Sequence, residues 1–427
     1  MINNNNPDVL AIFTSLLNLS DIEVTKIRES DNGRRITIAV KSTKEHVACR
    51  QCNKPTKAHG YGRTITLRHL SLLDKETYIE HTPRRGICVD CDDRPSTTER
   101  FNWYNANAKM TKPFEQFMLF ECVNSRVSDV SAKFNVDYHA IDNLINNYIE
   151  SKVDFSKIAS LSILGIDEIS IKKGYQKYVT LISYRVDQKV HVLGVVKGRK
   201  KADIVAFLNK IPKRLVKTIS IVCSDLYDGY VNACRDAFDN KVPVVADRFH
   251  VQKLYRKSLV TLRKAELKRL KRKLTAHDYK QLKAAVAILR RYKDYFTENE
   301  KEVVHMLFKL SPKLKEAYAF SRQFSAIYNS HITPKEAMTQ IADWILEVKA
   351  SKLNCFNKFI KTLQGYEDII TNYFINRNSS GFVEGFNNKA KVLKRRCYGL
   401  SNPVKFFKRL ILDTVGLERF RPGVVAF

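Results

Sequence analysis

The sequence lacks the marks of a membrane or secreted protein. Its 427 residues contain no run of about 18 apolar residues, so no transmembrane helix is predicted. The first residues, MINNNNPDVLAIF, lack the basic segment followed by an apolar segment that forms a secretory signal. The chain also has no internal repeat and no long low-complexity segment. We therefore expect a cytoplasmic protein with two or three globular domains.

Acidic residues are scarce in comparison with basic ones. The chain has 44 Asp and Glu against 74 Lys and Arg, which gives a formal net charge of +30 and a pI of about 9.7. Such an excess favours a polyanionic partner. Apolar residues make up 44% of the chain, enough for a buried core. We expect the polyanion to be nucleic acid and the protein to be associated with the nucleoid, with ribosome or membrane-surface binding as alternatives.

Nine cysteines in a cytoplasmic protein indicate metal ligands or free thiols before disulfides. Four of them form two CxxC pairs, Cys49 with Cys52 and Cys88 with Cys91. They lie in a segment, 21–100, whose alternating apolar and polar residues predict strands. Two such pairs predict a zinc ribbon, because four thiolates suit one tetrahedral zinc ion. A redox CxxC is the alternative, and it would need only one pair.

The two CxxC pairs are separated by 35 residues, so a hairpin has to bring them together. Three histidines lie nearby in the sequence, His46, His59 and His81, but four thiolates already complete the coordination of zinc. We expect these histidines at the surface. Residues 1–105 are therefore assigned to an N-terminal region with one structural zinc ion.

Residues 106–155 have the pattern of a helix-turn-helix. Helices are predicted over 126–134 and 138–149, and Asp137 can cap the second of them. The side chains expected to fill the small core are Ala132, Val136, Ile141 and Leu144. The side chains expected to face the major groove of DNA are Tyr138, His139, Asp142 and Asn143. Generic three-helix bundles share this pattern, so helix packing without DNA contact is the alternative.

From residue 160 the apolar and amphipathic segments follow the order β-β-β-α-β-α-β. This is the order of an RNase H-like mixed sheet, to which we assign residues 156–427, with 251–375 as a large all-helical insertion. We thus expect a multidomain protein of α+β and α/β class. Between Lys253 and Lys293 the chain has 15 Lys and Arg against two acids, which i,i+4 ion pairs do not explain. Part of this run is expected to be a solvated face. The residues predicted to contact DNA are Arg263, Lys264, Lys271 and Arg272.

Three acidic residues could form one catalytic site. Asp167 is predicted to end the first strand and Asp225 the fourth, so neighbouring strands would bring both carboxylates to one end of the sheet. Glu168 and Asp228 are rival acids, and Asp228 more readily starts the following helix. Because side chains alternate along a strand, only one of Asp167 and Glu168 should enter the site. Glu384, on a later predicted helix, is the third acid.

The helix that carries Glu384 is otherwise basic. At 100° per residue, one stripe carries an acid, an amide and two cations, namely Glu384, Asn388, Lys391 and Arg395. A separate stripe is apolar and consists of Val383, Phe386, Ala390 and Leu393. The helix can therefore pack by one side and present polar groups on another. Three acids suit two Mg²⁺ or Mn²⁺ ions about 3.5–4 Å apart, which can promote attack on a phosphodiester, while the cations hold phosphates.

The chain resembles bacterial insertion-sequence transposases of the DDE type, specifically the ISL-three branch, which has an N-terminal zinc ribbon. The resemblance rests on the two CxxC pairs and on four stretches, LGIDEISIKKGYQKYVT, VVKGRKKADIVAFL, VVADRFHVQKL and GFVEGFNNKAKVLKRRCYG. It extends from about residue 45 to 410. The resemblance implies a catalytic triad of Asp167, Asp225 and Glu384. It also implies supporting roles for Asp247 and His250, which lie in DRFH.

The resemblance implies a function as well. Such a transposase binds the terminal inverted repeats of its element, pairs two ends as a homodimer, cuts them to free 3′-hydroxyls and joins these to target DNA. Double-stranded DNA would be the partner, and the metals would be two Mg²⁺ or Mn²⁺ ions in each active site and one structural Zn²⁺. Two alternatives remain, another RNase H-like nuclease such as a junction resolvase, and a DNA-binding regulator derived from a transposase.

Overall fold

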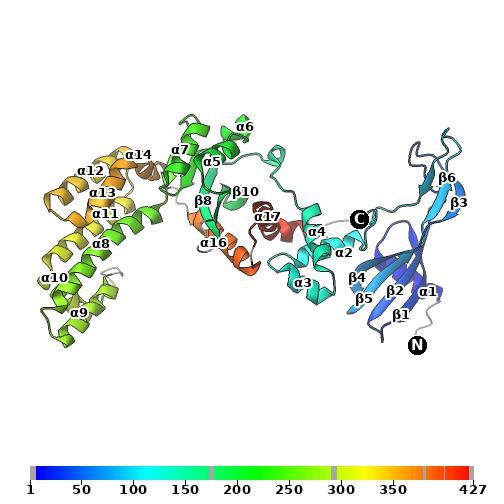
Figure 1. The fold of residues 1–427 in the computed structure, drawn as a ribbon, viewed down its shortest axis with the longest axis horizontal. Coiled ribbons are helices and arrows are strands. Elements are labelled where there is room, and N and C mark those ends of the chain that lie inside the picture. The colour runs from blue at the N-terminus through cyan, green and yellow to red at the C-terminus, as the bar shows by residue number, and fades with distance from the viewer. Residues whose placement is uncertain (1–5, 173–176, 290–295, 378–380, 399, 423–427) are drawn as a thin grey trace. The chain divides into compact units, whose positions relative to one another are not determined.

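Two compact units make up the chain. The computed structural model describes residues 6–172, 177–289, 296–377, 381–398 and 400–422 (Figure 1). The N-terminal unit combines Met1–Ser151 with Lys408–Phe427, and the central unit is Lys152–Phe407. The chain thus returns to its first unit after completing the second.

The first part of the N-terminal unit is built from β-strands. A four-stranded sheet has the order β1-β2-β5-β4, in which β2 and β5 are parallel and the other pairs are antiparallel. A second sheet has three short strands in the order β3-β6-β7. The elements are α1 (Pro7–Leu17), β1 (Ile22–Ser30), β2 (Arg35–Ser42), β3 (Lys57–Tyr61), β4 (Ile65–Leu72), β5 (Lys75–His81), β6 (Arg84–Ile87) and β7 (Ser96–Thr98).

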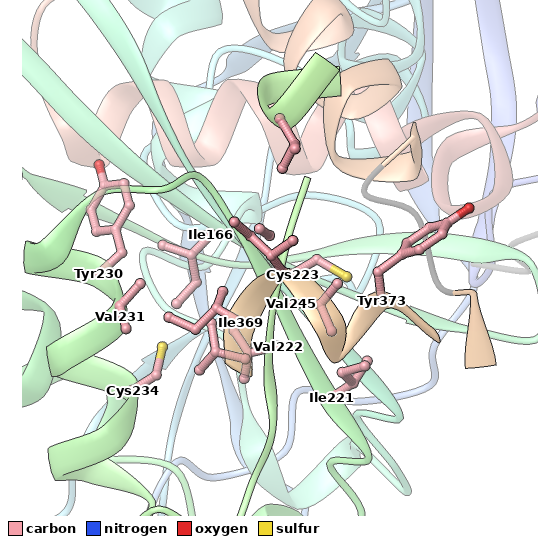
Figure 2. Close-up of a cluster of buried hydrophobic side chains, with 14 of the residues drawn as sticks. Ile166, Ile221, Val222, Cys223, Tyr230, Val231, Cys234, Val245, Ile369 and Tyr373 are labelled. Carbon is pink, nitrogen blue, oxygen red and sulfur yellow. The ribbon is translucent and has the colours of Figure 1, made fainter. Parts of the chain in front are cut away.

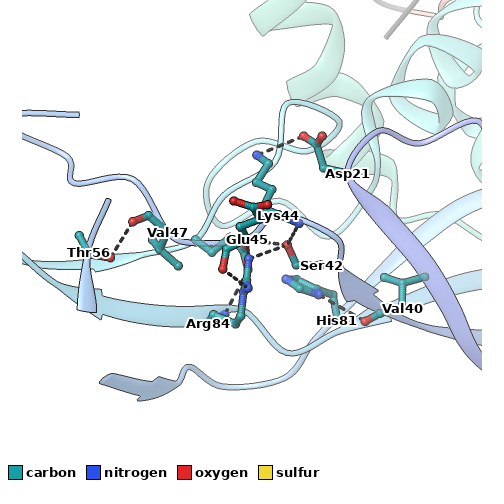
Figure 3. A network of polar contacts seen from close by, with 10 residues as sticks. Asp21, Val40, Ser42, Lys44, Glu45, Val47, Thr56, His81 and Arg84 are labelled. Carbon is teal, nitrogen blue, oxygen red and sulfur yellow. Dashed lines mark hydrogen bonds and ion pairs between the residues drawn. The ribbon is translucent and has the colours of Figure 1, made fainter. Parts of the chain in front are cut away.

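The alternation of side chains along β5 turns His81 into the core. His81 is only 1% exposed, and its ring packs edge-on against Phe101, so the expectation that it lies at the surface was wrong. Its Nδ1 contacts the carbonyl of Val40 (Figure 3), and burial lowers the pKa of the ring. The neutral imidazole is therefore the stable form. His46 and His59 are exposed, as predicted.

A buried ion pair connects the strands of the N-terminal unit. Glu99 is 3% exposed and accepts hydrogen bonds from Nη2 of Arg84 at 2.7 Å and from the Ser42 hydroxyl at 2.6 Å. Arg84 also donates to the Ser42 hydroxyl at 2.9 Å (Figure 3). Burial alone would raise the pKa of Glu99, but these hydrogen bonds and the charge of Arg84 outweigh it and lower the pKa below 4.5. The carboxylate therefore stays ionised in the folded protein.

Helices complete the N-terminal unit. They are α2 (Lys112–Glu121), α3 (Val127–Phe134), α4 (Tyr138–Tyr148) and the later turns of α17 (Pro403–Phe420). Their shared core includes Met118, Ile141 and Leu412, which are fully buried. The end of α17, which the sequence prediction grouped with the catalytic region, therefore packs with these helices.

The two helices predicted as a pair, α3 and α4, begin and end close to the expected residues. Asp137 caps α4 by accepting a hydrogen bond of 2.9 Å from a backbone N–H of the first turn. Ile141 and Leu144 are buried as predicted, but the prediction for Ala132 was wrong because its side chain is exposed. Ala132 lies about 200° around the helix from the buried Val130, so it faces away from the core.

The central unit is built on a five-stranded mixed sheet with the order β10-β9-β8-β11-β12. Strands β8, β9 and β10 are antiparallel neighbours, whereas β11 and β12 run parallel to β8. The elements follow the predicted order of strands and helices. They are η1 (Phe155–Lys157), β8 (Ile163–Lys172), β9 (Lys177–Val186), β10 (Lys189–Lys197), α5 (Lys201–Leu208), α6 (Lys213–Val216), β11 (Ile221–Ser224), α7 (Asp228–Ala237) and β12 (Val244–Ala246).

A tight apolar cluster holds the parallel strands and their helices together (Figure 2). The strands contribute Ile166, Val222, Cys223 and Val245, each at most 1% exposed. Helix α7 contributes Tyr230, Val231 and Cys234, and α14 (Glu367–Thr371) contributes Ile369. These contacts hold the first half of β8 against β11 and β12.

Between residues 251 and 375, the described elements are all helices, as predicted. The helices of this part and the one after it are α8 (Arg248–Lys271), α9 (Ala276–Ile288), α10 (Glu298–Leu310), α11 (Pro312–Asn329), α12 (Pro334–Ala350), η3 (Asn354–Phe356), α13 (Asn357–Gly365), α14 (Glu367–Thr371), α15 (Tyr373–Asn376) and α16 (Gly381–Arg396). Capping boxes start two of them, Thr297 with Glu300 at α10 and Thr333 with Glu336 at α12. In the described ranges, no helix is both long and apolar enough to cross a membrane.

Candidate active site and metal-binding cysteines

Three aspartates form a row across neighbouring parallel strands, at the level where β11 and β12 end. Ser224, the last residue of β11, lies beside Ile166 of β8 and Ala246 of β12 in the register of the sheet. Each of these residues is followed by an aspartate, and the row is Asp167, Asp225 and Asp247. Parallel strands end at the same edge, so side chains far apart in the sequence meet there.

Strand β8 extends further than predicted. Asp167 does not end it, because β8 continues beside β9 to Lys172. Its parallel neighbour β11 stops beside Ile166, so beyond that point the described part of β8 pairs only with β9. Asp167 and Glu168 both contribute to the wall of the cavity at this edge. Glu168 also pairs with Arg199 at 3.2 Å.

Helix α16 brings Glu384 to the same edge. It packs on β8 by the predicted apolar stripe, which is buried and consists of Val383, Phe386, Ala390 and Leu393. This close approach requires Gly165 in β8, because a Cβ there would lie 2.5 Å from Cγ2 of Val383 and 3.2 Å from a ring carbon of Phe382. Gly165 lies two residues before Asp167, and Val383 lies next to Glu384. One packing contact therefore positions both acids.

The acids share one cavity, with a volume of about 740 Å³. Its wall includes six of the residues predicted for the catalytic site, namely Asp167, Asp225, Asp247, His250, Glu384 and Lys391. Two others, Asn388 and Arg395, are exposed, and the described wall does not include them. The three predicted catalytic acids all line the cavity. Among the described residues, however, their carboxylate oxygens do not all lie within 4.8 Å of one another.

A histidine lies between two of the aspartates. Nδ1 of His250 is 2.8 Å from Oδ1 of Asp225 and 3.3 Å from Oδ2 of Asp247. Hydrogen bonds to Asp225 and then Asp247 raise the pKa of His250 to about 10 in spite of its burial. Burial, and then the negative charge of Asp225, raise the pKa of Asp167 to about 6. A divalent cation would remove this cost of ionising Asp167, so the oxygen donors of the cavity fit Mg²⁺ or Mn²⁺.

Sequence reasoning missed Asn387, which donates a hydrogen bond from Nδ2 to Oδ2 of Asp167 and is 1% exposed. The signal was available, because Asn387 follows Val383 by four residues and precedes Ala390 by three. It therefore shares the buried face of α16. A polar amide within an apolar stripe requires a partner, and here the partner is a carboxylate of the cavity.

Other missed residues come from the first turns of α8. The cavity wall there contains Phe249, Gln252, Lys253, Arg256, Lys257 and Val260. The DNA contacts predicted on this helix lie further along it. Arg263 is half-buried, while Lys264 and Lys271 are exposed and Arg272 is the C-cap residue.

The predicted DNA-contacting residues of the N-terminal unit lie at the start of α4. Tyr138 is 45% exposed and its ring lies edge-on to His139, with ring centroids 5.5 Å apart. Asn143 is exposed, whereas Asp142 is half-buried and accepts a hydrogen bond from Asn146. This helix end therefore offers mainly aromatic and amide groups to a ligand.

The four predicted zinc ligands converge in the N-terminal unit. The sulfur atoms of Cys49, Cys52, Cys88 and Cys91 all lie within 4.8 Å of one another. Cys49 and Cys91 are 4.0 Å apart, and Cys52 and Cys88 are 3.5 Å apart. Tetrahedral zinc with Zn–S bonds of about 2.3 Å requires sulfur separations near ~3.8 Å, so the cluster fits a zinc ion. The antiparallel pairing of β3 with β6, rather than a simple hairpin, brings the two pairs together.

A second cavity, of about 550 Å³, lies beside the first cysteine pair. Its wall combines cationic and hydroxyl groups with one buried acid, and the polar residues are Lys44, His46, Arg50, Ser96, Thr97, Thr98, Glu99 and Arg100. Arg50 and Arg100 are exposed, whereas Glu99 is paired with Arg84. The cavity therefore has an excess of positive charge and suits an anion such as a phosphate.

Residues 164–410 match the profile of a family described as "Transposase", the ISL3 branch of the DDE transposases. This match covers more than half of the chain. The chain belongs to the ISL3 family of DDE transposases. As such it is an enzyme that binds DNA. The matched segment of the transposase contains the row of aspartates, the helical insertion and α16, whereas the cysteine cluster lies outside it.

The transposase is also similar to curated transposases over most of its length. It is 23% identical over 382 residues to the transposase for insertion sequence element IS1001 of Bordetella parapertussis, which covers 89% of this chain and 92% of that protein. It is 20% identical over 437 residues to the transposase for insertion sequence element IS1557 of Mycobacterium tuberculosis, strain H37Rv, which covers 96% of this chain and 97% of that protein. The similarity thus includes the N-terminal unit.

Proposed function

We propose that this transposase cuts DNA at the ends of an insertion sequence and joins the freed 3′-hydroxyls to target DNA. Asp167, Asp225 and Glu384 are the proposed ligands of two divalent cations. The observation that carries the proposal is the row of carboxylates across β8, β11 and β12, which shares one cavity with Glu384 of α16. The order of the five-stranded sheet, with the acids at this edge, supports an RNase H-like catalytic fold. The curated relatives, named as transposases for insertion sequence elements, support DNA of this kind as the substrate.

The residues around the acids have distinct roles in this proposal. When bound, the cations supply Lewis-acid activation of the attacking and the leaving oxygen. Asn387 holds the carboxylate of Asp167 in one orientation through its hydrogen bond. His250 holds Asp225 in place and adds positive charge beside the DNA phosphate. Lys391, on the cavity wall, binds a phosphate oxygen by a charge-assisted hydrogen bond.

The N-terminal unit is the proposed reader of the terminal repeats. The helix α4 follows α3 as the recognition helix of a helix-turn-helix and presents Tyr138, His139 and Asn143 to the major groove. The four cysteines hold a structural zinc ion, and Arg50 and Arg100 of the neighbouring cavity bind backbone phosphates. Exposed cations of α8 add further phosphate contacts, so binding should weaken steeply with salt. Two ends have to be paired, which requires two chains.

The test is a cleavage and joining assay with the purified full-length protein and Mg²⁺. The DNA substrate carries both ends of the insertion sequence that encodes the protein, together with the DNA that flanks them. The wild type should release 3′-hydroxyl ends and join them to a target plasmid. Asp167→Asn, Asp225→Asn and Glu384→Gln should each lower both rates by roughly a thousandfold. The matched control is Asp228→Asn, because Asp228 starts α7, hydrogen bonds to Tyr366 and does not belong to the described cavity wall.

Each outcome separates one alternative. Cleavage without joining would identify a nuclease of the same fold. Specific binding of the ends without cleavage by the wild type would identify a DNA-binding regulator. Full activity of Asp167→Asn would show that the row of aspartates is not the catalytic site.

A further inference from the structure

One aromatic side chain of the cavity is largely exposed. Phe249, the second residue of α8, is 59% exposed and lines the same cavity as the acids. Its neighbours in the sequence are both engaged, Arg248 with Asn329 and Tyr373, and His250 with two aspartates. An exposed phenyl ring gives up the free energy of burial, so covering it with a ligand would recover that energy.

The first three turns of α8 have two opposite faces. The buried face carries Val251, Tyr255 and Ser258 and packs within the central unit. At 100° per residue, the opposite line carries Phe249, Lys253, Arg256 and Val260, and all four line the cavity. The ring and the first cation are four residues apart, which is about 6 Å along the helix axis. The exposed line therefore leads from the acids outward along α8.

The cations on this face are available to a ligand. Lys253, Arg256 and Lys257 are exposed, and within the described part of the chain none of them forms an ion pair. Ion pairs elsewhere on α8 do form, as between Glu266 and Arg269. Among the described residues, these three cations thus have no ion-pair partner of their own.

An aromatic ring followed by unpaired cations along one line suits a single strand of nucleic acid. The ring offers a face to a base, and the cations offer hydrogen bonds to successive phosphates. An apolar peptide would cover the ring but would leave the acids and cations beside it without partners. A base inside a duplex has no free face, so a base that reaches the ring has to leave its stack first.

We propose that Phe249 stacks on the base of a nucleotide displaced from the duplex next to the scissile phosphate, while Lys253 and Arg256 bind phosphates of the same strand. The inference rests on the proposed function, because it takes the cavity of Asp167 and Glu384 as the place of cleavage. Stacking on Phe249 holds the strand end in position for in-line attack. The contact does not depend on which base is present, since every base has an aromatic face.

The test compares four proteins on two kinds of DNA. The proteins are the wild type, Phe249→Ala, Phe249→Leu and Phe249→Tyr, and the DNA carries an element end that is intact or has one abasic position, moved stepwise across the cleavage point. On intact DNA, Phe249→Ala and Phe249→Leu should cleave about tenfold to a hundredfold more slowly than wild type, whereas Phe249→Tyr should cleave at nearly the wild-type rate. At one abasic position the wild type and Phe249→Ala should cleave at equal rates, because the base on which only the wild type can stack is missing.

The matched control is Leu346→Ala on α12. Leu346 is 65% exposed, lies in the same unit and does not belong to the described cavity wall, so its loss should leave the cleavage rate unchanged. Phe249→Leu keeps an apolar side chain but removes the aromatic face, so wild-type activity in Phe249→Leu would overturn the stacking role. An equal loss for Phe249→Ala on intact DNA and at every abasic position would also overturn it. Failure of the wild type to cleave intact DNA would instead reject the proposed function.

Discussion

The contact between β8 and α16 can be tested by adding one methyl group. In Gly165→Ala, the new Cβ would lie 2.5 Å from Cγ2 of Val383 and 2.8 Å from Oγ of Ser183. Carbon atoms in good contact are about 3.5–4.0 Å apart, so Val383 has to move by about 1 Å. Because Glu384 is the next residue, the carboxylate moves with it relative to Asp167.

The expected effects are moderate on stability and larger on activity. Overpacking of a buried contact costs about 1–3 kcal/mol. For a unit of this size, each kcal/mol lowers the melting temperature by about 2–4 °C, so a fall of roughly 2–12 °C is expected. A displacement of about 1 Å at a catalytic group can cost about a hundredfold in rate, so DNA cleavage should fall by about that factor. The matched control is Gly385→Ala in α16, where a Cβ meets no described atom within 4 Å. It should be neutral or stabilising by up to about 1 kcal/mol.

The assay is thermal unfolding followed by circular dichroism, combined with the cleavage rate at a temperature below both transitions. The double variant Gly165→Ala with Val383→Ala removes the clashing methyl and should recover activity beyond the sum of the single effects. A wild-type melting temperature and rate for Gly165→Ala would refute the packing of α16 on β8. A lower melting temperature with full activity would refute the coupling between this contact and Glu384.

Three further experiments test the N-terminal unit. Cys49→Ser should lower the zinc content of the purified protein, measured by atomic emission, well below one ion per chain; retention of one zinc would contradict the four-sulfur site. The pKa of Glu99 is lowered by its hydrogen bonds, so the stabilisation by its ionised form is complete above about pH 4.5 and is lost as the pH falls below that value. In urea unfolding between pH 7 and 3, the free energy of unfolding should therefore fall more steeply for the wild type than for Glu99→Gln. Equal slopes would reject the ion pair. In anisotropy titrations of DNA that carries an element end, Arg50→Ala and Arg100→Ala should each reduce the slope of log affinity against log salt concentration by about 0.9. The control is Lys26→Ala, an exposed lysine outside the described cavity wall, which should leave this slope unchanged.

The sequence predicts the framework of the central unit because local patterns specify it. Apolar runs mark β8 and β11, and an acid at the same place in neighbouring parallel strands has to reach the same edge. The zinc ligands are predictable for a similar reason, since two CxxC pairs can satisfy one tetrahedral ion. The apolar stripe of α16 follows from helical periodicity alone.

Features that depend on packing between distant segments were missed or misplaced. Asn387 was passed over for Asn388 although helical periodicity places it on the buried face; the identity of its partner, Asp167, depends on the packing of α16 on β8. His81 was expected at the surface because its burial depends on the pairing of β5 with its neighbours. The packing of α17 with α2 and α4 joins residues almost 300 positions apart, for example Asn124 and Asp413, which no local pattern reports.

The return of the chain to its first unit has a consequence for biosynthesis. Leu412, which is fully buried among the helices of the N-terminal unit, leaves the ribosome after the whole central unit. At 5–20 residues per second, translation of the intervening segment takes roughly 10–50 s. During this interval the sheet of the central unit can form, while the helices α2, α3 and α4 still lack part of their core. A message truncated near its 3′ end would therefore yield a chain that contains all the acids of the cavity but leaves the core of α2, α3 and α4 incomplete.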